Sequence, residues 1–171
     1  HIVQAEKDDF LLNKYFQNGI GKLSQYGLSY DLLIYPRQFP ATLKMVQKFP
    51  NQIFVLDHIA KPSVSEKLDA EWVKNIHLLS KHENVFCKIS GMVTETKNFE
   101  WVKSDFTPYL ASVVSAFGTD RLLYGSDWPV CLLAADYKEV LGIVADYFQN
   151  FSALEKSKIF MLNAIKVYNL D

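Results

Sequence analysis

Short apolar runs alternate with amphipathic runs along this chain. A nearly continuous run of Val, Ile, Leu and Phe, as in residues 52–58, is typical of a strand buried on both faces. An apolar residue at every third or fourth position, as in residues 68–82, predicts a helix. By these criteria the strands are expected at residues 29–35, 52–58, 84–90 and 121–124, with a strand stub at residues 2–3.

The helices are expected between these strands and after the last one. Pro50 stops the helix before it, and Gly118 is suited to the residue that follows a helix. Ser152 and Glu155 have the spacing of a capping box at the start of the final helix. The predicted helices cover residues 10–16, 41–49, 68–82, 106–117, 135–149 and 153–168.

Strict alternation of strand and helix predicts an α/β fold with a parallel sheet covered by helices. Both a doubly wound sheet and a (β/α)₈ barrel fit, but no glycine-rich phosphate loop follows any strand, which weakens the nucleotide-binding option. A barrel has eight strands and typically about 250 residues, whereas about five strands are found here. We therefore expect residues 1–171 to form a single barrel domain that lacks its first β/α units, and the apolar start without Met agrees.

Composition narrows the class of protein. The chain has 171 residues, of which 49% are hydrophobic and 22% charged, and its net charge is −1. These values suit one globular domain and favour neither nucleic acid nor an anionic membrane as a partner. Cys87 and Cys131 are far apart in sequence, and we expect reduced, buried thiols in a cytoplasmic protein.

Residues 122–129, LLYGSDWP, form the most informative segment. A short apolar strand ends on a Gly-Ser turn that presents Asp127, and Pro129 prevents the chain from continuing directly as a helix. An Asp in this place either caps the following turn or serves as a general base or metal ligand. The equivalent position of His58 favours the second interpretation, and Trp128 is a substrate-binding candidate beside it.

Further candidates follow the other predicted strands. His58 could ligate a metal or move a proton, or it could be a buried histidine bonded to a backbone carbonyl. Lys88 interrupts an apolar strand, so it should orient a substrate or form a salt bridge inside the barrel. Arg37 and Gln38 could bind a polyol or a carboxylate, or they could be ordinary loop residues.

Three segments carry a family resemblance: FVLDHIAKP at residues 54–62, CKISG at 87–91 with Thr94-Glu95 close behind, and DRLLYGSDWPV at 120–130. They resemble the amidohydrolase-2 branch of the amidohydrolase superfamily, and within it the sugar-lactone hydrolases of the L-fuconolactonase and L-rhamnonolactonase type. The resemblance spans essentially the whole chain.

The resemblance implies a (β/α)₈ barrel whose last strand ends in a catalytic aspartate, which matches Asp127, and a mid-barrel histidine, which matches His58. It also implies a His-x-His motif on the first strand, and this sequence has none. Some members use a divalent metal and others do not. A metal here, zinc before others, would use His58 and Asp127 only together with that motif; the alternative is no metal.

The leading hypothesis is a hydrolase that opens a lactone. Asp127 would deprotonate water, and His58 would polarise the lactone carbonyl and stabilise the oxyanion. Lys88, Arg37 and Gln38 would orient this small-molecule substrate. The alternatives are an amidohydrolase-fold decarboxylase or amidase, and an inactive partial barrel whose open sheet edges would favour a homodimer.

Overall fold

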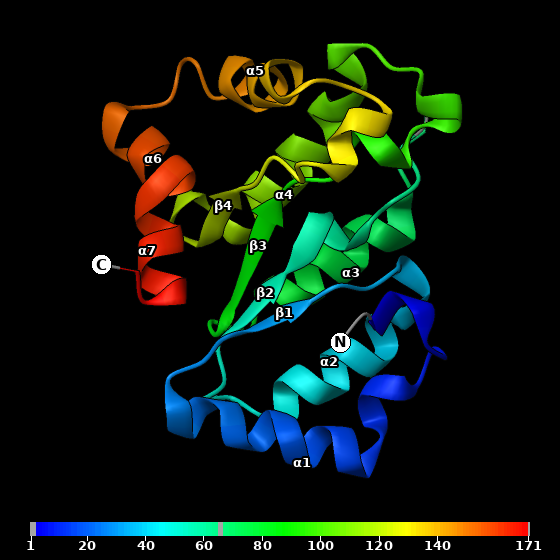
Figure 1. The fold of residues 1–171 in the computed structure, drawn as a ribbon, viewed down its shortest axis with the longest axis vertical. Helices are drawn as coiled ribbons and strands as arrows, with labels where there is room; N and C mark the ends of the chain where they lie inside the picture. The colour runs from blue at the N-terminus through cyan, green and yellow to red at the C-terminus, as the bar shows by residue number, and fades with distance from the viewer. Residues whose placement is uncertain (1–2, 65–66, 171) are drawn as a thin grey trace.

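The computed structural model describes residues 3–64 and 67–170, whose strands form one parallel sheet. The order is β1-β2-β3-β4, so each strand pairs with the next one in the sequence (Figure 1). Helical crossovers join the strands, and all four carboxyl ends therefore lie at the same edge of the sheet. The strands are β1 (Tyr30–Leu32), β2 (Phe54–Leu56), β3 (Val85–Ile89) and β4 (Leu122–Tyr124).

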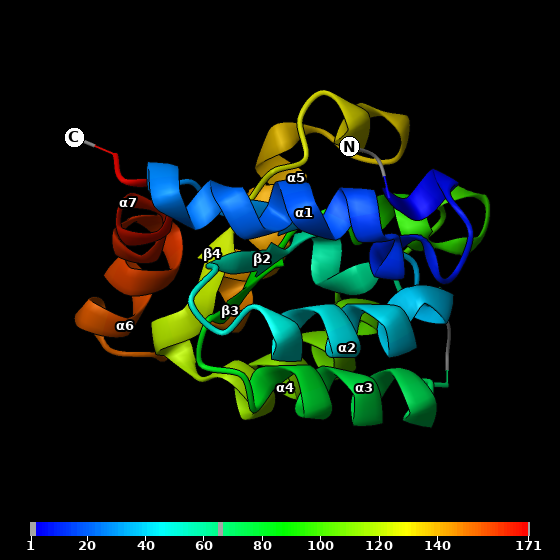
Figure 2. The same cartoon turned by 90° about the horizontal axis from the view of Figure 1, so that it is seen from below.

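Helices α2, α3 and α4 form one layer against a face of the sheet, which Figure 2 shows from below. The aromatic rings of Trp72 in α3 and Tyr109 in α4 lie 5.4 Å apart and join these two helices. We call the sheet surface under this layer the outer face. The helices are α1 (Lys14–Leu23), α2 (Phe39–Lys48), α3 (Ala70–Ser80), α4 (Thr107–Phe117), α5 (Tyr137–Tyr147), α6 (Ala153–Ser157) and α7 (Asn163–Tyr168).

The opposite surface of the sheet, which we call the inner face, has its own small apolar cluster. Val55, Phe86 and Leu123 are buried there against Val167 of α7, the red helix in Figure 1. These strand residues alternate with those of the outer face, because successive side chains of a strand point to opposite sides. The last helix of the chain therefore covers part of the inner face.

The predicted α/β class and the four main strands are confirmed, with shorter strands than expected. The helix predicted over residues 10–16 is wrong: a 3₁₀ turn covers Phe10–Leu12, and α1 starts only at Lys14. The reason is Asn13, whose side-chain oxygen accepts hydrogen bonds from the backbone N–H groups of Tyr15 and Phe16 (2.9 and 3.2 Å) and so fixes the helix start.

The final predicted helix, residues 153–168, is divided by a π-helical turn at Lys158–Leu162. Its predicted capping box is confirmed, with Ser152 N–H donating to Glu155 (2.9 Å) and Glu155 N–H donating to Ser152 (3.3 Å). Of the strand stub predicted at residues 2–3, Ile2 lies outside the described residues, and Val3 begins a 3₁₀ turn. That turn still lies beside β1, because Gln4 N–H donates to the carbonyl of Leu33 (2.9 Å).

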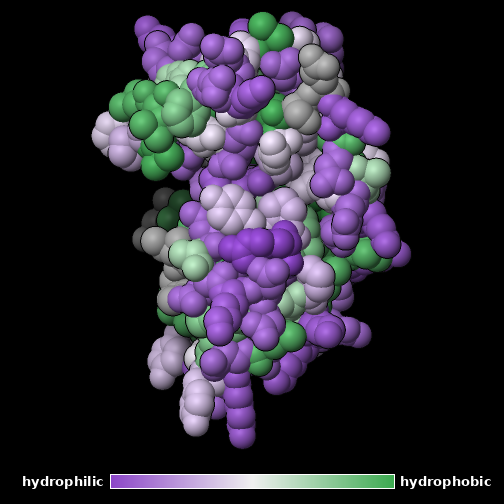
Figure 3. All heavy atoms as spheres, turned by 90° about the vertical axis from the view of Figure 1, so that its right-hand side faces the viewer, coloured by the Kyte–Doolittle hydropathy of each residue, from purple (hydrophilic) through white to green (hydrophobic). Residues whose placement is uncertain are grey.

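The surface fits the balanced composition. Figure 3 shows one side of the molecule, and most of the residues on it are hydrophilic with small apolar patches between them. Among the helices that the structure describes, none combines the length and apolar character needed to cross a membrane.

Candidate functional site

His58 and Asp127 meet at the carboxyl edge of the sheet. His58 follows β2 by two residues, and Asp127 follows β4 by three. The His58 Nε2 atom lies 3.7 Å from Asp127 Oδ1, and the two side chains are only 16% and 13% exposed. The structure therefore brings together the two residues that the sequence singled out as a pair.

The direction of His58 comes from an unusual turn. The predicted strand 52–58 ends at Leu56, so strand alternation does not set the direction of His58. Instead, four successive residues without glycine, His58 to Lys61, all have left-handed backbone angles (φ 50, 47, 63 and 49°). Each such residue costs about 1–2 kcal/mol, so the surrounding structure must hold the turn.

Two contacts hold this left-handed turn along its length. In its middle, the indole N–H of Trp72 donates to the carbonyl of Ile59 (2.9 Å). At its end, Lys61 forms an ion pair with Glu95, and both side chains are largely buried. Strain of this kind is typical of residues that must present a side chain in a fixed direction.

Ser90 and Gly91, directly after β3, form the seat of the His58 ring. His58 Nδ1 and Ser90 Oγ share a hydrogen bond of 2.8 Å. Gly91 has a left-handed backbone (φ 62°), and a Cβ atom there would lie only 2.7 Å from His58 Nδ1. Sequence reasoning missed Ser90 as a partner of His58, although its place at a neighbouring strand end could have indicated it.

The imidazole of His58 is held in its neutral form. Burial lowers its pKa to about 4, and the charges of Lys61 and Lys88 act in the same direction. The carboxylates of Asp127 and Asp31 oppose this shift without cancelling it. A neutral ring near pH 7 can donate one hydrogen bond and accept another.

Asp127 occupies a tight turn after β4. Its backbone is left-handed (φ 58°), a conformation that Asp tolerates better than most residues. Its carbonyl accepts a hydrogen bond from Cys131 N–H (2.9 Å), which starts the next 3₁₀ turn. The adjacent Trp128 is 63% exposed, so its predicted substrate contact stays a prediction.

Lys88 makes the ion pairs that the sequence analysis gave as one alternative. Its ammonium lies 2.9 Å from Asp31 Oδ2 in β1 and 2.6 Å from Asp57 Oδ1 just after β2. Burial opposes the charge of Lys88, but the attraction of the Asp57 carboxylate prevails and raises the pKa of Lys88. A direct contact of Lys88 with substrate stays a prediction.

Arg37 and Gln38 contact the start of the described chain instead of the His58–Asp127 pair. Arg37 forms an ion pair with Asp8 and donates to the carbonyl of Gln4 (2.8 Å). Gln38 is fully buried, and its amide donates to the carbonyl of Val3 (2.7 Å). Their predicted role toward a substrate also stays a prediction.

A metal ion would find part of a site here. Zinc ligands lie about 2.0–2.2 Å from the ion, so two ligand atoms of a tetrahedral site are about 3.4 Å apart. The 3.7 Å between His58 Nε2 and Asp127 Oδ1 is close to that spacing. Within residues 3–64 and 67–170, however, no three His, Cys, Asp or Glu side chains gather as a metal site. The pair can supply two ligands.

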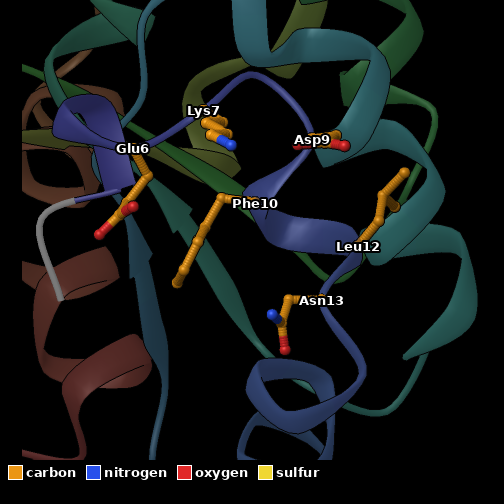
Figure 4. A pocket seen from close by; sticks show the side chains of 6 residues that line it. All are labelled: Glu6, Lys7, Asp9, Phe10, Leu12 and Asn13. Carbon is orange, nitrogen blue, oxygen red and sulfur yellow. The ribbon is translucent and has the colours of Figure 1, made fainter.

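A separate hollow of about 310 Å³ lies on the turns that precede α1. Figure 4 shows the side chains that line it, and none of them comes from the carboxyl ends of the strands. Asn13, one of them, is engaged as the N-cap of α1. This hollow and the His58–Asp127 pair therefore share no residue. Its lining residues are Glu6, Lys7, Asp9, Phe10, Leu12 and Asn13.

Comparison with known proteins shows to which family this chain belongs. The family model described as amidohydrolase matches residues 1–170. The chain belongs to the amidohydrolase family. It is 34% identical to an L-fucono-1,5-lactonase of Burkholderia multivorans over 99% of its own length, and 31% identical to an L-fucono-1,5-lactonase of Burkholderia ambifaria over 96%.

A solved structure agrees with this family assignment. An amidohydrolase of Burkholderia multivorans, crystallised with bound zinc, superposes on the whole chain with a TM-score of 0.92 at 34% identity. The amidohydrolase chain covers 63% of that structure, and 62% and 58% of the two lactonases. Its four strands thus correspond to part of an amidohydrolase barrel, as predicted.

Proposed function

We propose that the protein hydrolyses the lactone of a sugar acid. The observation that carries this proposal is the pair of His58 Nε2 and Asp127 Oδ1, 3.7 Å apart and largely buried at the carboxyl edge of the sheet. Barrel enzymes place their chemistry at this edge. The names of the two similar lactonases support an internal ester as the substrate class.

In the proposed reaction, Asp127 takes a proton from water while the water oxygen bonds to the lactone carbonyl carbon. The ring C–O bond then breaks, and Asp127 returns the proton to the ring oxygen. The product is an open hydroxy acid, which releases a proton to solution near pH 7.

His58 would stabilise the oxyanion of the tetrahedral adduct. If the Ser90 hydroxyl donates to Nδ1, the ring proton resides on Nε2, the nitrogen that faces Asp127. That N–H can then donate to the carbonyl oxygen as negative charge develops on it. The lowered pKa of His58 keeps the ring neutral near pH 7, as this role requires.

If a divalent metal such as zinc is bound, His58 Nε2 and the Asp127 carboxylate would be two of its ligands. A bound metal polarises a carbonyl and lowers the pKa of bound water. In that case the ring proton would reside on Nδ1 and be donated to Ser90.

Two further expectations belong to this proposal. The buried free thiols of Cys87 and Cys131 suit a reducing compartment such as the cytoplasm. β1 and β4 are the edge strands of the described sheet, and pairing of two copies along such an edge would give a homodimer. Sedimentation analysis would show whether two copies associate.

The test is an assay of proton release from L-fucono-1,5-lactone and related sugar-acid lactones. Replacing Asp127 by Asn removes the base and should lower kcat at least about a hundredfold. Asp120→Asn is the matched control, because Asp120 is an exposed aspartate at the opposite end of the same strand. Near-normal turnover by the Asp127→Asn variant would refute the assignment of the base.

A further inference from the structure

A partly buried charge network lies on the inner face, and one of its members, Asp57, directly precedes His58 in the sequence. Lys88 bridges Asp31 of β1 (2.9 Å) and Asp57 after β2 (2.6 Å). The Lys88 and Asp57 side chains are 20% and 13% exposed. One ammonium therefore serves two carboxylates, and each carboxylate competes for it.

Tyr168, from the last helix, is a second hydrogen-bond partner for Asp31. Its hydroxyl lies 3.0 and 2.9 Å from the two carboxylate oxygens of Asp31 and donates to that carboxylate. Its ring lies beneath the Lys88 ammonium, 5.4 Å from the nitrogen to the ring centre. Because the phenol satisfies Asp31, the ammonium of Lys88 stays available for Asp57.

Asp57 is the residue immediately before His58 and therefore before the left-handed turn. Trp72 holds the middle of that turn and Glu95 holds its end. The ion pair with Lys88 fixes the side chain at its start. Three contacts thus hold the turn that carries His58, and one of them is the ion pair of Asp57 with Lys88, while Ser90 bonds the ring itself.

We propose that Lys88 and Tyr168 are positioning residues, which fix Asp57 and thereby aim the His58 imidazole at Asp127. This inference rests on the proposed function, in which the His58–Asp127 pair performs the chemistry. It assigns to the C-terminal helix a role in the site at the carboxyl edge of the sheet. Lys88 acts here through Asp57 and does not contact the substrate.

The experiment compares Tyr168→Phe and Lys88→Met with two controls in the complete protein. Tyr168→Phe removes only the hydroxyl and keeps the ring beneath Lys88. Lys103→Met is the control for charge, because Lys103 forms an exposed ion pair with Asp146 (2.5 Å). Tyr147→Phe in α5 is the control for loss of a hydroxyl.

The first measurement is the ring ¹⁵N chemical shifts of the histidines at one fixed pH, with His58 assigned by the loss of its signals in a His58→Asn variant. We expect both test variants to move the His58 signals and to leave those of His77 and His82 in place. Unchanged His58 signals in folded test variants would overturn the proposal. Circular dichroism shows whether each variant folds. If Lys88→Met does not fold, the His58 signals of Tyr168→Phe alone test the proposal.

The second measurement separates kcat from KM for a sugar-acid lactone. Misalignment of a catalytic group lowers kcat, so we expect a loss of about tenfold for Lys88→Met and a few-fold for Tyr168→Phe, with KM nearly unchanged. A raised KM with normal kcat would show that Lys88 contacts the substrate and would overturn the proposal. If no lactone is hydrolysed, the proposed function fails, and the ring signals still decide whether Lys88 and Tyr168 position His58.

Discussion

The two faces of the sheet are built from the same short strands, and they differ in what they demand from the rest of the chain. The outer face presents residues such as Phe54, Leu56 and Cys87, which are fully buried under the helical layer. The inner face presents Asp31 and Lys88, and the ammonium of Lys88 pairs with Asp31 and with Asp57. One face contributes stability through burial, and the other arranges polar groups for a site.

This difference determines which amino-acid substitutions each face tolerates. Burial is non-directional, so an apolar residue on the outer face needs only neighbours of suitable size. A buried charge needs a specific partner at a specific distance. On the inner face that partner can be remote in sequence, as Tyr168 is from Asp31, 137 residues away.

The largest expected effect on folding is on the outer face. Phe54 is fully buried, and Phe54→Ala should lower the free energy of unfolding by about 3–5 kcal/mol, because it leaves a cavity beneath the helices. Urea denaturation measures this loss. Tyr15→Ala, at a position 85% exposed on α1, should change stability by less than about 0.5 kcal/mol. Equal losses in the two variants would contradict the assignment of the core.

A smaller effect is expected at the seat of His58. Gly91→Ala adds a Cβ in a left-handed backbone and 2.7 Å from His58 Nδ1, so we expect a loss of about 2 kcal/mol in stability and a lower kcat. Gly27→Ala is the control: its backbone is also left-handed (φ 66°), but nothing lies within 4 Å of the added atom. Gly27→Ala therefore reports left-handed backbone strain without a clash, and the idea fails if both variants keep the same kcat.

The hydrogen bond to His58 should contribute less. Ser90→Ala removes the partner of Nδ1, and we expect a loss of about 1 kcal/mol in the free energy of unfolding. The proposed function adds a reduced kcat, because the ring proton is no longer fixed on Nε2. Ser112→Ala on α4 is the control. It removes a hydroxyl that donates to a backbone carbonyl (2.8 Å), and it should leave kcat unchanged. A Ser90→Ala enzyme with full kcat would show that this hydrogen bond is not needed.

The sequence predicted the outer face well, because continuous apolar runs and helical stripes depend on local pattern. It also predicted the strand ends that carry His58 and Asp127. It could not predict the left-handed turn at His58, since four such residues without glycine persist only through Trp72 and Glu95, which come from other segments. Local propensity contains no information about such contacts.

The charge network on the inner face could not be predicted from the sequence for a related reason. An interrupting Lys88 indicated either a salt bridge or a substrate contact, but which of them forms depends on Asp57 and Tyr168 meeting it in space. Ser90 is a similar case, because a serine after a strand is common and gains meaning only through the ring beside it. The pattern of a strand predicts where a polar residue sits, and the fold decides its partner.

The smallest effect concerns Tyr30, a polar exception on the outer face. Tyr30 packs its ring against Phe54 and Phe16, and its buried hydroxyl has no hydrogen-bond partner among the residues that the structure describes. Burial, with the negative charge of Asp31, raises the pKa of this phenol to about 12. The folded state therefore keeps a proton between pH 10 and 12 that the unfolded state loses, and stability falls as the pH rises through this range.

Tyr30→Phe removes this source of alkaline sensitivity. Near pH 8 the variant should be as stable as the parent to within about 0.5 kcal/mol, and between pH 10 and 12 it should lose less stability than the parent does. Urea denaturation at pH 8 and pH 11 measures the difference. Tyr26→Phe, at a position 75% exposed, should keep the full slope. If the two variants have the same slope, Tyr30 does not behave as a buried polar group in an otherwise apolar part of the outer face.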